Sequence, residues 1–316
     1  MRCGDRQASH HKPPPAGAKR PSSPVIHHQS SIINSPGFTL VELLVVIALI
    51  ALLLAIFIPA LGMARERGQR AVCLSNLRQL TLAWITYAEE HGGKLVFGNA
   101  FTMGIEGNKR TESWVHPIFR FAKSRSELIE YRNKGALWPY LRDIDIYRCP
   151  RGRAGHALTY TIVGGANGNG AEGTYVSGIN PDATHASVRV GSTMLRLTRI
   201  TDIVSPGAGQ RAVFLDHGHM RNGSFLIEYQ YPRWMSPPPI HHHDGVTLSM
   251  ADGHAEYWKW KGRETITGLP RTVLEDGREE LVDGSYEPQT EDGLYDLQRT
   301  QRATWGRLGY TTEKTP

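Results

Sequence analysis

One long apolar stretch dominates the pattern of hydrophobic and polar positions along this chain. Of the 24 residues from 38 to 61, 21 are Ala, Val, Ile, Leu or Phe. A helix of this length is roughly 36 Å long at about 1.5 Å per residue, and that length crosses the hydrocarbon layer of a bilayer. We therefore predict a transmembrane helix over residues 38–61.

The helical pattern continues past the apolar stretch. Apolar side chains recur every three or four residues along one face, at Leu74, Leu77, Leu80, Trp84 and Tyr87. Gly92 and Gly93 then provide a C-terminal stop. We predict an amphipathic continuation of the helix over residues 62–91, with its apolar face packed on a folded head.

Residues 92–261 have the pattern of a globular α+β head. Alternating and β-branched runs predict short strands at residues 158–163, 187–197, 211–215, 246–250 and 255–260. The pattern also predicts an interrupted short helix at 126–141 and a Gly- and Asn-rich loop at 164–173, and residues 262–316 are charged and rich in turn residues. One long helix followed by a run of strands predicts a helix packed on an antiparallel sheet.

Glu42 is the one charged residue of the apolar stretch and lies close to its start. A carboxylate in hydrocarbon is costly unless it has a partner or a function. The sequence offers a partner, since cleavage after Gly37 would leave Phe38 with a free ammonium group four residues before Glu42.

This segment, from Gly37 through Glu42 into the apolar stretch, resembles the processing and assembly segment of type IV prepilins and type II secretion pseudopilins. The resemblance implies that residues 1–37 are a leader peptide, that cleavage follows Gly37, and that Phe38 is then N-methylated. It assigns Glu42 to assembly, and Pro59 matches a helix-loosening proline of many pilins. It also implies a pilin-like fold, in agreement with the α+β pattern.

The same resemblance implies a location and a set of partners. The chain is expected to cross the inner membrane once, with its N-terminus in the cytoplasm and its head in the periplasm. The expected partners are a prepilin peptidase, other pilin or pseudopilin subunits and an inner-membrane assembly platform. The implied function is that of a non-enzymatic subunit of an inner-membrane filament, of the type II secretion or type IV pilus class.

A second motif begins at His242, which is followed after nine residues by Asp252 and Gly253. Together with the N-terminal segment, this spacing resembles a large group of bacterial pseudopilin-like proteins that carry an H-x9-D-G motif. Three further pieces match the same group, at residues 73–79, 148–150 and 303–306. The local pattern indicates a hairpin whose turn is Asp252-Gly253.

The hairpin also gathers residue types that bind divalent metals. His242, Asp244, Asp252 and His254 lie near its ends, and the Asp-His-Gly-His run at residues 216–219 could join them. Imidazole groups suit zinc, nickel and copper, and carboxylates suit calcium. Either these residues form a metal site, or His242 and Asp252 only support the turn. The sequence indicates no other cofactor.

Two cysteines remain once the leader is removed, Cys73 and Cys149. An oxidising periplasm permits a disulfide between them. Buried free cysteines are also common, so both states stay open at this point.

Charge and motifs exclude some function classes. The formal net charge is +6 for the whole chain and +2 without the leader, which leaves 31 basic and 29 acidic residues. The mature chain therefore has no basic footprint for nucleic acid. The sequence contains no nucleophile elbow, phosphate-binding loop or H-E-x-x-H motif, which argues against an enzyme.

A protein of another class fits the same pattern. A monomeric membrane anchor could carry a periplasmic head that binds a carbohydrate or a metal, with Trp234, Trp258 or Trp260 as exposed aromatic contacts. The two hypotheses differ at Glu42, because a filament subunit needs this carboxylate and a simple anchor does not.

Processing at Gly37 is directly testable. We predict that the mature chain begins at an N-methylated Phe38 when a prepilin peptidase is present. We also predict that Gly37→Ala slows the cut, because a Cβ atom crowds the scissile bond. Intact-mass measurement on membrane-extracted protein checks both. A mature chain that keeps residues 1–37, or a cut elsewhere, would contradict the prediction.

Overall fold

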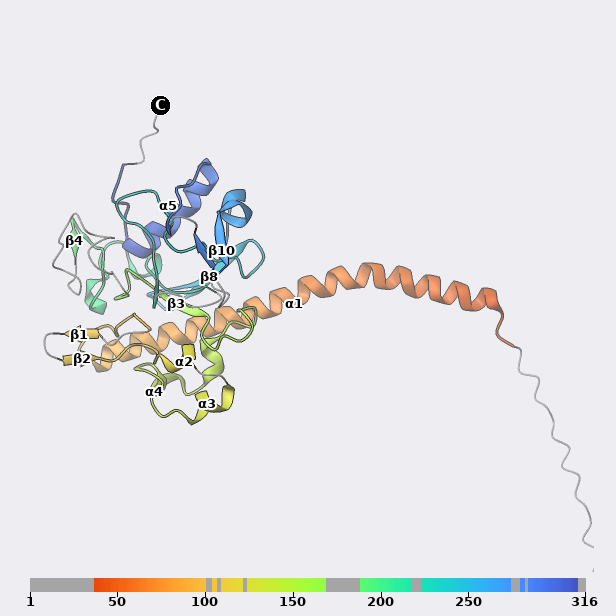
Figure 1. Cartoon of the computed structure of the whole chain (residues 1–316), viewed down its shortest axis with the longest axis horizontal. Helices are drawn as coiled ribbons and strands as arrows, with labels where there is room; N and C mark the ends of the chain where they lie inside the picture. Colours follow the sequence, from red (N-terminus) through yellow and green to blue (C-terminus); the bar gives the residue numbers. More distant parts are fainter. Residues whose placement is uncertain are drawn as a thin grey trace, which may run out of the picture. The chain divides into compact units, whose positions relative to one another are not determined.

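The computed structural model of the chain (Figure 1) describes the following residues: 37–100, 104–106, 109–121, 124–168, 188–217, 223–273, 279–281 and 284–311. Most of the predicted leader and part of the predicted loop at 164–173 lie outside these residues. The chain forms two compact units that divide after Ala55, and the second unit holds the head.

Helix α1 runs from Leu40 to Glu90, which confirms the prediction of one long N-terminal helix, and Pro59 lies within it. Among the described residues, α1 is the helix that is long and apolar enough to cross a membrane. Its most apolar 18-residue window has a mean hydropathy of 3.2, and 0% of that window is buried inside the chain. These apolar side chains therefore need lipid or other chains to cover them.

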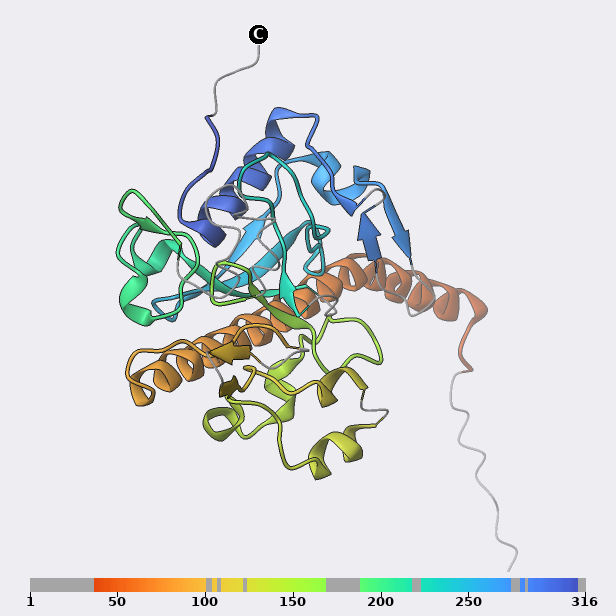
Figure 2. The same ribbon diagram turned by 60° about the vertical axis from the view of Figure 1, so that its left-hand side comes forward.

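The head (Figure 2) is built on a five-stranded sheet. Its strand order is β7-β3-β6-β8-β9. Neighbouring strands are antiparallel except for β3 and β7. The five strands are β3 Tyr160–Val163, β6 Ala212–Asp216, β7 Ser224–Phe225, β8 Gly245–Met250 and β9 Ala255–Lys259. The described residues also form three two-stranded sheets, which are β1 Gly104–Glu106 with β2 Lys109–Thr111, β4 Arg189–Val190 with β5 Thr193–Met194, and β10 Arg271–Val273 with β11 Glu279–Leu281.

Short helices fill the connections between these strands. They are the α-helices α2 Ile118–Phe121, α3 Arg125–Glu130 and α4 Trp138–Leu141, the 3₁₀ helices η1 Ile144–Tyr147, η3 Ile200–Asp202 and η4 Ala208–Gln210, and the π-helix η5 Glu264–Gly268. The last helix is α5, Glu291–Trp305.

Helices cover both faces of the five-stranded sheet. On one face, Thr81 of α1 donates a hydrogen bond to Ser249 of β8 at 2.6 Å. On the other face, Leu248 of β8 and Ala303 of α5 line the same apolar pocket. Successive residues of a strand point to opposite faces, so β8 presents Ser249 to α1 and Leu248 to α5. The result is the helix-on-sheet arrangement that the sequence predicts.

A second layer covers the C-terminal half of α1 on the side away from the sheet (Figure 1). Asn76 of α1 donates a hydrogen bond to the backbone carbonyl of Arg148 at 3.2 Å, and Glu90 accepts one from the hydroxyl of Tyr140 at 2.6 Å. This part of the helix is therefore enclosed by the segment that holds α2 to α4 and by the sheet.

The predicted strands at 158–163, 211–215, 246–250 and 255–260 correspond to β3, β6, β8 and β9. The strand predicted at 187–197 is wrong as one strand. It is a hairpin of two short strands, and Gly191 lies between them with a φ of +61°, which favours glycine. The helix predicted at 126–141 is split into α3 and α4, with Gly135 between them at a φ of +103°.

The charged C-terminal segment contains α5, which the sequence analysis did not predict. Thr290 caps its N-terminus by accepting a hydrogen bond from the N–H of Gly293, and Gly306 ends it in the left-handed conformation. Trp305 is 1% exposed, so the C-terminal end of α5 is packed in the core.

The packing of α1 on the head can be tested by a substitution at Trp84. Trp84 is 0% exposed, so Trp84→Ala should lower the free energy of unfolding by about 3–5 kcal/mol. The exposed Gln79 on the same helix provides a matched control, and Gln79→Ala should change stability by less than about 0.5 kcal/mol. Urea unfolding of the detergent-solubilised protein measures both, and equal effects would contradict this packing.

Glu264 ties η5 to the start of α5 and makes stability depend on pH. Partial burial alone would raise the pKa of Glu264, but hydrogen bonds from Thr290, Gln289 and Tyr286 hold it below its ordinary value. A carboxyl group with a lowered folded-state pKa stabilises the fold above its unfolded pKa and loses that contribution as the pH falls through the folded value.

We therefore expect Glu264→Gln to destabilise the head at neutral pH by about 1–3 kcal/mol. The difference from the natural chain should shrink as the pH falls through the lowered folded-state pKa of Glu264, because its carboxyl group then becomes uncharged like glutamine. Urea unfolding at neutral pH and over a series of decreasing acidic pH values measures this, with Glu89→Gln on an exposed site as the control. A pH-independent difference would show that charge plays no part.

Candidate functional sites

The first turn of α1 is closed by a reciprocal pair of side chains. The backbone N–H and the hydroxyl of Thr39 donate to Oε2 of Glu42 at 2.8 and 2.7 Å, and the backbone N–H of Glu42 lies 3.2 Å from the Thr39 hydroxyl oxygen. This is a capping box, in which a Thr and a Glu three residues later satisfy two backbone donors of the helix start. Glu42 therefore has a local partner, which the sequence analysis missed although the Thr-x-x-Glu spacing indicates it.

The predicted cleavage site lies directly before this cap. Gly37 and Phe38 are exposed, and Phe38 has 72% of its surface accessible. A Cβ added at Gly37 would meet no atom of the chain within 4 Å. A requirement for glycine at this position would therefore come from a processing enzyme and not from the fold.

A second site lies in the core of the head, where four metal-ligating side chains from four different segments meet. Cys73 belongs to α1, Cys149 follows η1, Asp216 ends β6 and His242 precedes β8. Each of the four is at most 1% exposed. One ligand atom from each lies within 4.8 Å of the other three. We call these four residues the buried cluster.

Three short contacts connect the buried cluster in series. Sγ of Cys73 lies 3.4 Å from Oδ2 of Asp216. The same oxygen lies 3.4 Å from Nε2 of His242, and that nitrogen lies 3.3 Å from Sγ of Cys149. The imidazole therefore faces a carboxylate and a thiol through one nitrogen.

Burial and mutual contact set the protonation of this cluster. Burial alone would raise the pKa of Asp216, but the hydrogen bond from His242 holds it below its ordinary value. Burial would lower the pKa of His242, but Asp216 and Cys149 raise it to about 9. Burial raises the pKa of Cys73, whereas a hydrogen bond from Cys73 lowers that of Cys149. The protonation states of the four groups are therefore coupled.

The structure separates the four residues that the sequence suggested as a metal site. His242 is in the buried cluster, whereas Asp252 and His254 bond to each other at 2.6 Å at the far end of the hairpin. Asp244 pairs with Lys259 at 2.9 Å. The six residues of β8 lie between the two ends, a distance of roughly 20 Å at about 3.3 Å per residue. A single ion does not bridge that distance.

The residues predicted as a metal site are close in sequence, but the residues that meet in the fold are those of the buried cluster. The structure places Asp216 of the predicted 216–219 run in the buried cluster, and it gives His217 a contact from Nε2 to the carbonyl of Pro237 at 3.2 Å. Residues 218 and 219 lie outside the described part of the chain. Cys73 and Cys149 come together, as a disulfide would require, although no bond joins them in this structure, and the disulfide stays a prediction.

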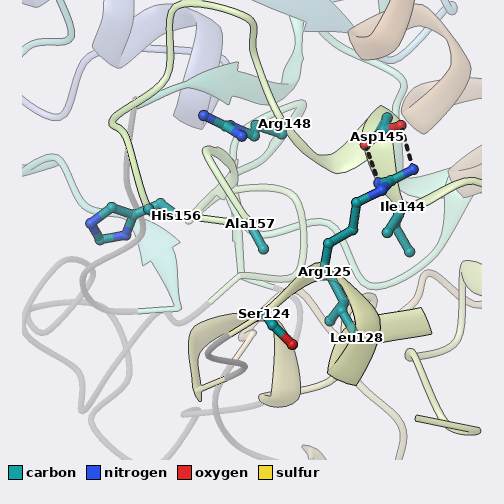
Figure 3. A pocket seen from close by; sticks show the side chains of 9 residues that line it. Ser124, Arg125, Leu128, Ile144, Asp145, Arg148, His156 and Ala157 are labelled. Atoms are coloured by element: carbon teal, nitrogen blue, oxygen red, sulfur yellow. Dashed lines mark hydrogen bonds and ion pairs between the residues drawn. The ribbon is translucent and has the colours of Figure 1, made fainter. Parts of the chain in front are cut away.

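A surface pocket of about 250 Å³ lies between α3 and η1 (Figure 3). On one side of it Arg125 and Asp145 form an exposed ion pair at 2.7 Å, and Arg148 and His156 lie on the other side. The pair is bidentate, with Arg125 donating to both carboxylate oxygens of Asp145, but both side chains are exposed and solvent screens their attraction. The charged side chains of this pocket are exposed, unlike those of the buried cluster.

Comparison with known proteins assigns the N-terminal segment. Residues 34–58 match the prokaryotic N-terminal methylation motif. The chain carries a prepilin-type N-terminal segment. It is also similar to the type IV wide pilus major component PilA4 of Thermus thermophilus, with 52% identity over 44 residues, which are 14% of this chain and 34% of PilA4. The chain therefore matches about a third of the length of that relative.

The comparisons leave the head without an assigned relative. No solved structure matches the chain significantly. The matched methylation motif ends at residue 58, so it does not extend to His242 and Asp252, and the H-x9-D-G resemblance has no support from it. What the head does must be argued from its own geometry.

Proposed function

We propose that this chain is a pilin-like subunit of an inner-membrane filament, of the type IV pilus or type II secretion class, and that a prepilin peptidase processes it. The observation that carries the proposal is the N-terminal methylation motif at residues 34–58, which opens a helix that continues to Glu90. The long helix packed on a mostly antiparallel sheet is the pilin-like α+β arrangement. Other pilin or pseudopilin subunits and an assembly platform are the partners this function requires.

The exposed half of α1 supports the assembly role. Its large apolar side chains are open to the surroundings, from Leu40 at 77% exposure to Leu61 at 58%. In lipid, helices associate through close packing and through polar pairs, because lipid covers apolar surface as well as another helix does. Glu42 is the polar group that this half offers, and a neighbouring subunit's N-terminal ammonium is the partner of opposite charge.

The rival hypothesis of a binding head on a simple anchor loses its suggested ligand contacts. Trp234, Trp258 and Trp260 are 1%, 5% and 3% exposed, so they are core residues. The indole N–H of Trp260 donates to the carbonyl of Pro239 at 2.7 Å, and Arg299 stacks over Trp258. These side chains do not form an exposed aromatic platform for a carbohydrate.

The capping box makes the test of Glu42 specific. Glu42→Gln keeps the capping geometry, because glutamine also serves at this position of the box, and it removes the charge. Thr39→Ala removes the cap and keeps the charge. We predict that both variants insert into the membrane and are cleaved, but that only Glu42→Gln fails to enter filaments. Crosslinking in cells, followed by analysis of the crosslinked ladder, measures incorporation.

Two other outcomes have clear meanings. If Glu42→Gln and the natural chain give equal ladders, the carboxylate does not drive assembly and the monomeric anchor becomes the better hypothesis. If Thr39→Ala is lost from filaments and Glu42→Gln is not, Glu42 acts only as a helix cap. Intact-mass analysis of the same samples confirms that cleavage occurred in each variant.

A further inference from the structure

We propose that Cys73, Cys149, Asp216 and His242 bind one Zn²⁺ ion in a closed, tetrahedral, structural site. This inference concerns the head alone and does not depend on filament assembly. It uses the sulfur, oxygen and nitrogen atoms of the buried cluster as the four ligands.

The contact between His242 and Asp216 is longer than a charge-assisted hydrogen bond and fits two ligands of one metal ion better. Charge-assisted N–H···O contacts are usually about 2.7–2.9 Å long, but Nε2 of His242 and Oδ2 of Asp216 are 3.4 Å apart. Ligands at zinc bond lengths of about 2.0–2.3 Å form a tetrahedron with edges of roughly 3.3–3.8 Å. The three contacts of 3.3, 3.4 and 3.4 Å fall in that range, and the other pairs of ligand atoms lie within 4.8 Å of each other.

The chemistry of the four ligands selects zinc. The two thiolates are soft donors, the imidazole is a borderline donor and the carboxylate is a hard donor, and zinc binds all three types. Calcium and magnesium take oxygen ligands instead. Zinc in structural sites is four-coordinate, with Cys, His and Asp among its ligands. On binding, both thiols lose their protons and Nε2 of His242 gives up any proton it carries, and these protons pass to solvent.

Glu66 provides an independent indication of a metal ligand at His242. Oε1 of Glu66 lies 3.4 Å from Nδ1 of His242, and neither atom has a hydrogen-bond partner among the described residues. Metal-bound histidines commonly donate the N–H of their other nitrogen to a carboxylate, which fixes the ring. A zinc ion on Nε2 places that proton on Nδ1, facing Glu66, and Arg70 holds the carboxylate from the other side at 3.0 Å.

Polar groups around the two sulfurs suit thiolates. The hydroxyl of Tyr160 donates to Sγ of Cys73 at 3.3 Å, and the hydroxyl of Thr247 lies 2.9 Å from the same sulfur. The backbone N–H of Arg151 donates to Sγ of Cys149 at 3.3 Å. Donors directed at the ligand atoms compensate the negative charge that three ionised ligands bring to the core.

A disulfide and a catalytic thiol are the competing uses of these cysteines. A disulfide would engage Cys73 and Cys149 only, and would leave the carboxylate of Asp216 and the ring of His242 buried beside an apolar bridge. Nucleophilic catalysis by Cys149 requires a substrate to reach its sulfur, but Cys149 is 0% exposed. A structural metal uses all four residues and needs no access for a substrate.

A surface pocket lies close to the cluster. Its volume is about 310 Å³, and it is lined by Glu66, Pro150 and Arg151 together with three further residues of α1. Glu66 faces His242, and Pro150 and Arg151 follow Cys149 directly. A zinc ion bound by the buried cluster would join four segments at one point: α1, the η1–β3 connection, β6 and the segment that leads into β8.

Metal binding by the full-length, detergent-solubilised chain tests the proposal. The protein is purified reduced, without a histidine tag, stripped with a chelator and titrated with Co²⁺ and then Zn²⁺. We expect one equivalent of Co²⁺ to give the intense visible bands of a tetrahedral site and a sulfur-to-cobalt charge-transfer band, and Zn²⁺ to remove both. Cys149→Ser should abolish the charge-transfer band or reduce it strongly. The control His254→Ala, at the far end of the same hairpin, should leave the spectrum unchanged.

Glu66→Gln provides a second readout in a variant that keeps all four ligands. Loss of an outer carboxylate partner usually weakens metal affinity by about 10–100-fold, and we expect a loss of that size in competition with a chelator of known affinity. The natural chain decides the question even if every variant misfolds. Absence of stoichiometric Co²⁺ binding, a spectrum without thiolate bands, or a Cys73–Cys149 disulfide in the unreduced natural chain would each overturn the proposal.

Discussion

One constraint governs the whole structure: helix α1 has to serve two different environments. Its first part is apolar on all sides, with none of its most apolar window buried in the chain. Its later part is buried in the head and carries polar residues that face the sheet, including Cys73 and Thr81. A polar group in a protein core is costly without partners. The surrounding strands therefore supply them, and Ser249 and Thr247 of β8 are matched to Thr81 and Cys73.

This polar seam between α1 and the sheet explains why the buried cluster forms where it does. Cys73 lies on the helix face that meets β6 and β8, so Asp216 at the end of β6 contacts it. His242, which precedes β8, in turn contacts Asp216. Cys149, which follows η1, completes the cluster through its contact with Nε2 of His242. Removing any one of the four would leave the others buried with fewer partners. A zinc ion would satisfy all four at once and would fix the head to the helix that carries it.

The sequence predicted the parts of the fold that depend on local pattern. The length of α1, the face formed by Leu77, Leu80 and Trp84, and the β8–β9 hairpin follow from periodicity and from one Asp-Gly turn. Helix α5 was missed because its buried positions include polar residues such as Asp296 and Gln301. These residues interrupt the apolar pattern by which a buried helix is predicted from sequence. The buried cluster was missed because its members are 67 or more residues apart, except for Asp216 and His242.

The most direct test of the account places a photocrosslinking amino acid at one position of the full-length chain in cells that contain the prepilin peptidase. The account predicts that a probe at Leu54, in the exposed apolar part of α1, crosslinks to other pilin-like subunits. It predicts that a probe at Trp84, in the buried part, crosslinks only within the chain. Crosslinks from Leu54 to lipid alone, in cells that assemble filaments, would contradict the central claim that this helix carries the subunit into a filament.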